Sequence, residues 1–490
     1  MTAPTLFPEP RAFALAKGGM PDVQATRALA RCSGRGWLGL PWRQFSRSGC
    51  MATIDAAGNA GRRIHTGEWR AVALSFVYFF CVLTAYYVMR PVREQLSAAV
   101  GSTQLPWFYA GTFFATLALA PVFGALVSRY PRRIVVPVVY LFFIACLIGF
   151  IPLFTHQGLL SPRALGTAFF VWVSVFNLFV VSVFWSFMAD IWSEEQSRRL
   201  FPIIAVAGTA GAITGPLLTK TLVDVIGVAP LLAVSATLLA AAVVCAILLG
   251  QWARVHGARR HDASHETAIG GGMLDGLKQV FTQPFMRSMA FLLLLADGIG
   301  TVNYALVSDY SGATFSDAVA RTRFAANVDL TANILTVVLQ LLVTRWLLPR
   351  KGPGLLITLW AGISVIALSL VIFSPDPHAP IVGGFPAVAL ALIISRGLAY
   401  GMAEPARHSL FTRVPRNERY KGQNTVDTAV WRFGDMAIAL GMNGLRSLGV
   451  AAGGFATLSA LAAFTAAAIG VRLSRQAMFG GRESRAPART

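Results

Sequence analysis

The sequence predicts an all-α membrane protein with twelve transmembrane helices in two pseudo-symmetric six-helix bundles. Three observations lead to this prediction: the composition, the recurrence of apolar runs, and a repeat of basic connectors. Hydrophobic residues make up 55% of the 490 residues and charged residues only 13%, about half the charged share of soluble domains. Uncharged apolar runs long enough to cross a bilayer recur after residue 70,. A soluble fold is therefore excluded.

The N-terminal segment, residues 1–70, differs from the rest of the chain. Its first fifty residues hold seven Lys or Arg, with Glu9 and Asp22 as the acids, and show no sustained apolar period. We expect a basic, disordered tail. A basic amphipathic targeting arm and a later start at Met51 are the alternatives.

The apolar runs place the spans in chain order. Arg90 to Glu94 continue the first span past its apolar part, and Pro91 can kink it,. The predicted spans are 71–96, 107–128, 133–155, 164–190, 201–222, 229–250, 285–306, 325–347, 354–374, 380–403, 424–446 and 450–472.

The connectors repeat between the two halves of the chain. The second–third and eighth–ninth connectors are both short and basic, and the fourth–fifth connector resembles the tenth–eleventh. Two six-helix halves joined by a linker are typical of secondary transporters. The expected organisation is a tail at 1–70, an N-terminal bundle at 71–250, a linker at 251–284, a C-terminal bundle at 285–472 and a basic tail at 473–490.

The distribution of Lys and Arg predicts the orientation. With the N-terminus inside, the tails and even-numbered connectors hold 32 of these residues, whereas the odd-numbered connectors hold 7. This bias places both termini on the cytoplasmic side of the membrane, with residues 307–324 outside. Because the net charge of +20 comes mainly from tails and connectors, the expected partner is the bilayer and not nucleic acid.

Motifs for catalysis are absent from the sequence. It contains no phosphate-binding loop of the G-x-x-x-x-G-K-[ST] type, no H-E-x-x-H and no nucleophile elbow,. The five cysteines are scattered and form no C-x-x-C pair,. We expect no enzymatic activity, no cofactor and no metal.

Charged faces on the last helices are the strongest functional signal. In the tenth span, Arg396, Tyr400, Glu404 and Arg407 fall within roughly 80° of one another on a helix,. Such a face is costly in hydrocarbon unless it meets water, substrate or another charged face. We expect it to line the transport path.

The eleventh span has a second charged face. Asp427, Arg432 and Asp435 cover an arc of roughly 140°,. Asp427 and Arg432 are five residues apart, too far round for a pair within one helix. We expect each to meet a partner on another helix or on the substrate, with Arg432 contacting anionic cargo.

Milder polar stripes mark four other spans. They serve either a water-facing path or hydrogen bonds that hold the helices together. The stripes are Tyr86, Arg90, Arg93 and Glu94 in the first span; Ser174, Asn177, Ser182, Trp185 and Asp190 in the fourth; Asp297 and Tyr304 in the seventh; and Asp329, Asn333, Thr336 and Gln340 in the eighth.

The second–third connector resembles a loop motif of the major facilitator superfamily. The superfamily motif has Asp where this chain has Ser128 and Gly where it has Pro131. The resemblance implies that the third, sixth, ninth and twelfth helices are peripheral, and the interiors of those spans lack charged residues. The motif reads Gly124-x-x-x-Ser128-Arg129-x-x-Arg132-Arg133.

A second resemblance is to the ADP,ATP carrier (nucleotide translocase) family. It rests on S-R-G-x-x-Y-x-x-x-E-P-x-R and K-G-x-x-x-V-D-x-x-x-x-R-x-G-D from residue 395, on the segment 89–94, and on F-W-S-F-M-A-D from residue 184. Arg93 stands where the family has a lysine implicated in transport, and the matched positions of the eleventh-helix motif are Lys421, Asp427 and Arg432. The chain resembles a bacterial relative of these carriers, which implies a bacterial inner membrane. Pro91 stands where that family has an aspartate, and Asp435 stands where it has a lysine. Because these changes alter the charge, the resemblance does not imply the same cargo.

The sequence thus predicts a secondary transporter that moves a small anionic solute by alternating access. The open alternatives are a nucleotide exchanger and a proton-coupled exporter of unrelated compounds; a scaffold or membrane enzyme is disfavoured. Residues expected to bind substrate are Arg90, Arg93, Glu94, Trp185, Asp329, Asn333, Arg396, Tyr400, Glu404, Asp427, Arg432 and Asp435. Residues expected in the cytoplasmic gate and loops are Arg129, Arg132, Arg133, Asp190, Arg198, Arg199 and Lys421. The acids among the first set either hold the arginines or take up a coupling proton.

Overall fold

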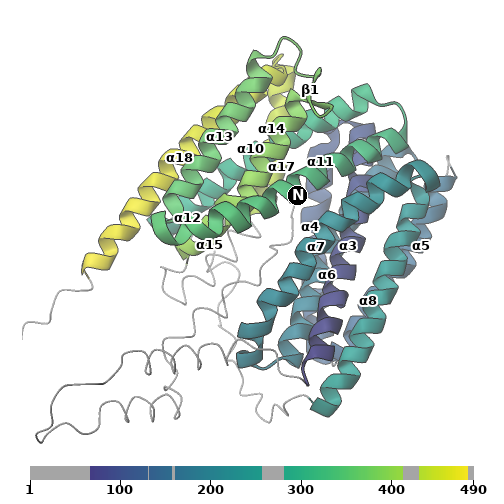
Figure 1. The fold of residues 1–490 in the computed structure, drawn as a ribbon. Helices are drawn as coiled ribbons and strands as arrows, with labels where there is room; N and C mark the ends of the chain where they lie inside the picture. Colours follow the sequence, from purple (N-terminus) through teal and green to yellow (C-terminus); the bar gives the residue numbers. More distant parts are fainter. Residues whose placement is uncertain (1–66, 131, 157–159, 257–280, 412–429, 484–490) are drawn as a thin grey trace, which may run out of the picture.

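The fold is almost entirely helical (Figure 1). The structure, a computed structural model, describes residues 67–130, 132–156, 160–256, 281–411 and 430–483. The N-terminal half comprises α3 (Trp69–Val100), the 3-10 turn η2 (Ser102–Gln104), α4 (Leu105–Arg129), α5 (Arg132–Thr155), α6 (Pro162–Ile191), α7 (Glu194–Ile226) and α8 (Ala229–His256). The C-terminal half comprises α10 (Pro284–Thr314), α11 (Ala318–Val338), η3 (Leu339–Thr344), α12 (Arg345–Lys351), α13 (Pro353–Phe373), β1 (Pro380–Val382), β2 (Phe385–Pro386), α14 (Ala387–Leu398), η4 (Ala399–Ala403), α15 (Glu404–Phe411), α17 (Trp431–Ser447) and α18 (Ala452–Glu483).

Two bundles stand side by side, one purple to teal and the other green to yellow (Figure 1). In the first, α3 packs on α6, α7 and α8; in the second, α10 packs on α14, α17 and α18. Ten helices in the described ranges are long and apolar enough to cross a membrane. Helices α4 and α17 occupy the places of the second and eleventh predicted spans. The predicted fold class is confirmed.

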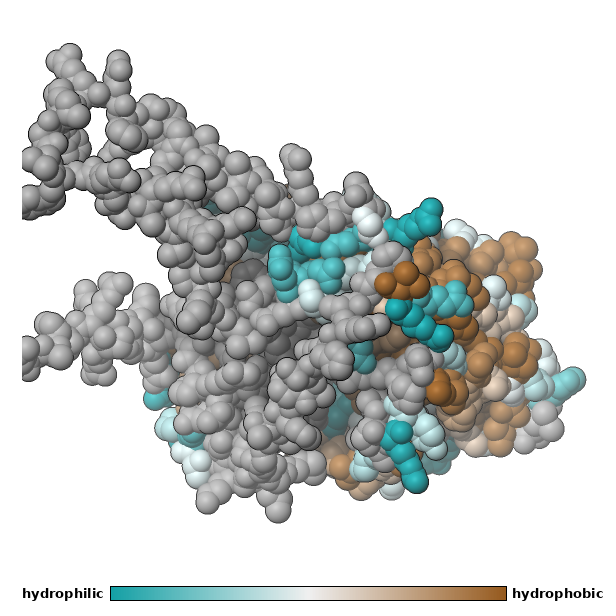
Figure 2. Space-filling model, turned by 90° about the horizontal axis from the view of Figure 1, so that it is seen from below, coloured by the Kyte–Doolittle hydropathy of each residue, from teal (hydrophilic) through white to brown (hydrophobic). Residues whose placement is uncertain are grey.

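The outer flanks of the bundles are apolar. Phe142 on α5, Ile366 on α13 and Phe464 on α18 are largely exposed. Figure 2 shows apolar side chains gathered on one flank of the molecule. An exposed apolar surface of this kind suits a hydrocarbon environment. Helices α5 and α8 pack on each other, as do α13 and α18, at opposite sides of the molecule (Figure 1).

Glycines bring α7 close to α3. A Cβ atom added at Gly211 would lie 2.9 Å from the carbonyl oxygen of Phe80 and 3.0 Å from the backbone nitrogen of Thr84. Gly208 and Gly215 face the side chains of Phe79 and Tyr87 in the same way. Small residues at this spacing allow helix backbones to touch.

The start of the tenth span corrects the prediction. The expected span begins at residue 380, but residues 380–386 form a two-stranded antiparallel hairpin, and the helix begins at Ala387 and runs to Phe411. Gly383 and Gly384 at the turn have φ angles of 59° and 80°. Two positive φ angles are what a tight two-residue hairpin turn requires, and glycine supplies them without steric cost.

Two π-helical segments interrupt neighbouring helices. η3 follows α11, and η4 separates α14 from α15. A π turn leaves carbonyl groups out of the regular pattern. Side chains of η3 donate to carbonyls of η4: Gln340 donates to that of Tyr400 at 3.1 Å and Thr344 to that of Gly401 at 2.6 Å. π-helical turns often occur at functional sites, and these lie directly after the helices that hold Asp329 and Arg396.

The two bundles are joined at the end where η2 lies. The backbone nitrogen and the hydroxyl of Ser102 donate to Asp309 of α10 at 3.0 and 2.7 Å. Asp309 also pairs with Arg446 of α17 at 2.6 Å. Arg323 of α11 pairs with Asp224 of α7 at 3.2 Å. These contacts hold the two bundles together at that end of the molecule.

Candidate substrate-binding site

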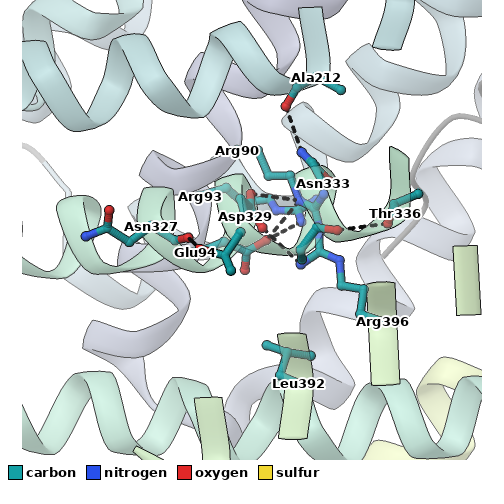
Figure 3. Close-up of polar contacts among 12 residues, drawn as sticks. Arg90, Arg93, Glu94, Ala212, Asn327, Asp329, Asn333, Thr336, Leu392 and Arg396 are labelled. Atoms are coloured by element: carbon teal, nitrogen blue, oxygen red, sulfur yellow. Dashed lines mark hydrogen bonds and ion pairs between the residues drawn. The ribbon is translucent and has the colours of Figure 1, made fainter. Parts of the chain in front are cut away.

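A buried charge network joins the two bundles (Figure 3). Asp329 of α11 pairs with Arg396 of α14 at 2.9 Å and lies 3.4 Å from Arg90 of α3. Arg90 lies 3.6 Å from Glu94, which also pairs with Arg93. The network therefore spans α3 in the N-terminal bundle and two helices of the C-terminal bundle.

The five charged residues of this network do not balance. Three arginines face two carboxylates, which leaves one positive charge in surplus. Arg90 is 1% exposed and Arg93 and Asp329 are 2% exposed. Burial makes an uncompensated charge costly, because little water screens it.

Several donors in the network also remain unused. Among the described residues, Arg90 Nη1, Arg93 Nε and Arg396 Nη2 are buried and donate no hydrogen bond. A buried donor without an acceptor costs about 1–3 kcal/mol, and more when it is charged. An anion that enters the network would accept these bonds and neutralise the surplus charge.

A smaller cavity of about 30 Å³ lies between the bundles beside the network. Glu94 of α3 forms one side. Tyr304 of α10, Asp329 of α11 and Arg396 of α14 form others. The cavity thus reaches charges of both bundles.

A larger cavity of about 90 Å³ lies within the C-terminal bundle. Arg396, Tyr400, Glu404 and Arg407 all line it, although η4 interrupts the regular helix between them. Glu404 and Arg407 pair with each other at 2.8 Å. Because Arg396 lines both cavities, it connects the interbundle network with this space.

Two carboxylates lie on another wall of the larger cavity. Asp297 of α10 and Asp435 of α17 both line it and interact with each other. Asp435 is 1% exposed and accepts a hydrogen bond from Thr301 at 3.2 Å. Arg432 Nη1 lies 4.0 Å from Asp435 Oδ2.

Arg432 has one carboxylate nearby on its own helix. Asp435, at 4.0 Å, is three residues further along α17; a partner for Arg432 on another helix or on the substrate stays a prediction. The i,i+3 spacing places the two side chains on neighbouring positions of the helix. The prediction considered only the five-residue separation from Asp427, which lies outside the described residues together with Lys421.

Three polar residues of the eighth span bond to other helices. Asn333 donates to the carbonyl of Ala212 in α7 at 2.7 Å, so it joins the two bundles (Figure 3). Thr336 and Gln340 donate to backbone carbonyls of the α14–η4 segment. These contacts favour interhelical hydrogen bonding over a water-facing path for the three residues. Asp329 is the one residue of this stripe that lines the smaller cavity.

Trp185 lies in an aromatic cluster. Its ring packs edge to face on Phe79, Phe184 and Phe201. The described linings of the two cavities do not include it. Its geometry is that of a packing residue between α3, α6 and α7.

The gate and loop residues are only partly described. Arg199 of α7 pairs with Glu68 at 2.9 Å, at the start of α3. Asp190 and Arg129 are exposed at helix ends. The side chains of Arg132, Arg133 and Arg198 lie outside the described part of the structure.

The larger cavity is also lined by Asp297, Thr301 and Arg407, which are not among the substrate-binding candidates. Asp297 had a visible signal, because it belongs to the polar stripe of the seventh span. Arg407 shared the predicted face with Arg396. Thr301 had no signal of its own, since its importance comes from Asp435, which is 134 residues away in the sequence.

A comparison with protein families matches residues 71–439 to the model of the Major Facilitator Superfamily. The chain belongs to this superfamily. It is accordingly a multi-pass membrane transporter for a small molecule and not an enzyme. No curated protein matches the chain.

Solved structures of superfamily transporters share the fold. The nucleoside transporter NupG is 15% identical, with a TM-score of 0.58 over 85% of this chain and 99% of that chain. A bacterial homologue of the iron transporter ferroportin is 14% identical, with a TM-score of 0.56 over 83% and 98%. The xylose transporter XylE from E. coli is 13% identical, with a TM-score of 0.51 over 81% and 94%. These likenesses extend to the fold only, and none of the comparisons supports the narrower resemblance to the ADP,ATP carriers.

Proposed function

We propose that this superfamily member is a secondary transporter that moves a small organic anion by alternating access. The observation that supports this most is the network of Arg90, Arg93 and Arg396, with one surplus positive charge and unused donors. Arg is suited to carboxylate and phosphate because its planar fork donates two parallel hydrogen bonds. Arg90 and Arg396 come from different bundles, so an anion between them would respond to a relative movement of the bundles.

We also propose an orientation. Both termini face the cytoplasm of a bacterial inner membrane, as the Lys and Arg distribution favours,. The contact of Asp309 with Ser102 and that of Asp224 with Arg323 then lie on the outer side. We infer that these contacts close the outer side. This arrangement corresponds to the inward-facing stage of alternating access.

Nucleotide is a less favoured cargo. ATP and ADP carry three or four negative charges, and the described network offers a surplus of one positive charge. Nucleotide exchange is therefore an alternative that an experiment can detect. Counterflow of labelled ATP against ADP in liposomes would show nucleotide exchange, and flux driven by a pH gradient would show proton coupling.

The first test is a thermal-shift screen of the purified protein against phosphorylated and carboxylated metabolites, because a ligand that binds the folded state raises the melting temperature. We expect hits among small monoanions and dianions. Arg90→Lys keeps the charge but loses the fork, so we expect near-normal membrane abundance and at least tenfold weaker binding of every hit.

Arg350→Lys is the matched control. Arg350 lies at the end of α12, where it stacks on Trp346, and we expect its replacement to leave binding unchanged. Binding by Arg90→Lys equal to that of the unchanged protein would reject the network as the anion site.

A further inference from the structure

The two cavities share one turn of α14. Leu392 and Arg396, which are four residues apart, line both the smaller and the larger cavity. Positions four residues apart lie on one face of a helix. Arg396 therefore belongs to the charge network and also to the wall of the larger cavity. A ligand that its guanidinium group holds can extend into the larger cavity.

Arg396 keeps a hydrogen-bond donor for such a ligand. Its Nη1 atom donates to Asp329 at 2.9 Å, whereas Nη2 is buried and donates no hydrogen bond within the described part of the chain. The side chain of Arg396 is 9% exposed. Because a buried charged donor without an acceptor is costly, an anionic group at this position would be bound by a charge-assisted hydrogen bond.

The other charged residues that line the larger cavity interact with one another. Glu404 pairs with Arg407 at 2.8 Å. Asp297 and Asp435 hydrogen-bond each other, which requires a proton between the two carboxyl groups. These four residues are therefore compensated without a second charged group on the ligand.

The rest of the larger cavity is mostly apolar. Leu293, Ile357 and the ring of Trp360 line it and are buried. The indole nitrogen of Trp360 donates to the carbonyl of Ser395 at 3.2 Å, so the ring offers the ligand an apolar surface. An apolar cavity of about 150 Å³ admits benzene. The volume of about 90 Å³ therefore suits a chain of a few carbon atoms.

We propose that the cargo is an amphipathic anion, with one anionic group and a short aliphatic chain. This inference rests on the proposed function and specifies its substrate class. The anionic group accepts hydrogen bonds from Arg396, where the two cavities meet. The chain lies in the larger cavity against Leu293, Ile357 and Trp360, and its removal from water stabilises the complex.

The first experiment varies the chain and keeps the anionic group. Full-length protein is titrated by thermal shift at neutral pH with acetate, valerate and heptanoate. Burial of each methylene group should tighten the dissociation constant about fourfold. We expect at least a tenfold gain from acetate to valerate. Because the cavity is small, we expect no further gain from valerate to heptanoate.

The second experiment keeps the chain length and changes the polarity of the chain. β-Methoxypropionate has the length of valerate, with an ether oxygen in place of one methylene group. An ether oxygen loses its hydrogen bonds to water when it enters apolar surroundings. We expect it to bind at least fivefold more weakly than valerate.

Ala296→Leu tests the position of the chain. Ala296 of α10 is half-buried and lines the larger cavity, so the longer side chain fills existing space. We expect the gain of valerate over acetate to fall below twofold. Ala313→Leu, at the exposed end of α10, is the matched control and should retain the full gain. The ligand comparisons in the unchanged protein remain decisive if Ala296→Leu does not fold.

The results distinguish this inference from the proposed function. Equal binding of acetate and valerate, equal binding of valerate and β-methoxypropionate, or a full gain in Ala296→Leu would overturn the amphipathic anion. A gain that continues to heptanoate would overturn it too, because partition into detergent has this effect. If hydrophilic anions of the metabolite screen bind but valerate does not, this inference alone fails. If no anion binds, the proposed function fails and this inference with it.

Discussion

At the scale of single residues, Asp329 links the two bundles electrostatically. It lies within ion-pair distance of Arg90 from α3 and Arg396 from α14. Each arginine would otherwise face a second cation in a buried space. The charge of Asp329 is therefore needed for the bundles to approach in the empty protein.

Asp329→Ala is expected to lower stability strongly. It leaves two buried guanidinium groups without this carboxylate, and breaking a buried pair costs about 3–5 kcal/mol in soluble proteins. We expect a clear fall in melting temperature and membrane abundance, with a smaller fall in Asp329→Asn. Asp376→Ala serves as the exposed control. A melting temperature of Asp329→Ala equal to that of the control would show that the network adds nothing to stability.

At the scale of elements, contacts between helix backbones decide how the bundles pack. Gly211 lets α7 touch the backbone of α3. Side chains of the π segment η3 donate hydrogen bonds to backbone carbonyls of the π segment η4. The glycine spacing that permits the close approach of α7 and α3 can be read from the sequence. The π segments follow no residue spacing that predicts them.

Gly211→Ala is expected to destabilise the N-terminal bundle by about 1–3 kcal/mol, the usual cost of overpacking. The added methyl group would meet backbone atoms of α3 that cannot rotate away. Gly149→Ala in α5 is the control, because no atom lies within 4 Å of the added group and alanine favours a helix over glycine. Equal melting temperatures for the two variants would contradict the close approach of α7 and α3.

At the scale of the whole molecule, membrane orientation connects the fold with transport. Residues 307–324 are predicted to lie outside, but Ser311 in this range is buried in α10 and cannot be labelled easily. Ser316, in the connector between α10 and α11, is exposed and replaces it.

A single cysteine at Ser316 is expected to react with a membrane-impermeant maleimide on whole cells, whereas one at Ser264 in the linker should not. Both are made in a background without the five native cysteines. After the cells are opened, Ser264→Cys should also react, which controls for protein abundance. Labelling of Ser264→Cys on intact cells and protection of Ser316→Cys would reverse the proposed orientation.

The sequence by itself determined the fold class, the approximate spans and the charged positions of the first and tenth helices. Apolar runs have the length of a bilayer, and a charge inside such a run stands out because hydrocarbon penalises it. These signals are local, so they can be read without a partner.

Only the tertiary structure decided which charges meet. It joined Asp329 to Arg90 and Arg396, set Asp297 beside Asp435, and turned Asn333 toward the backbone of α7. Helical periodicity places a side chain on a face but does not say which helix lies opposite. The helix that lies opposite depends on packing between segments distant in sequence. The surplus of one guanidinium over the carboxylates can therefore be counted only once the partners in the network are known.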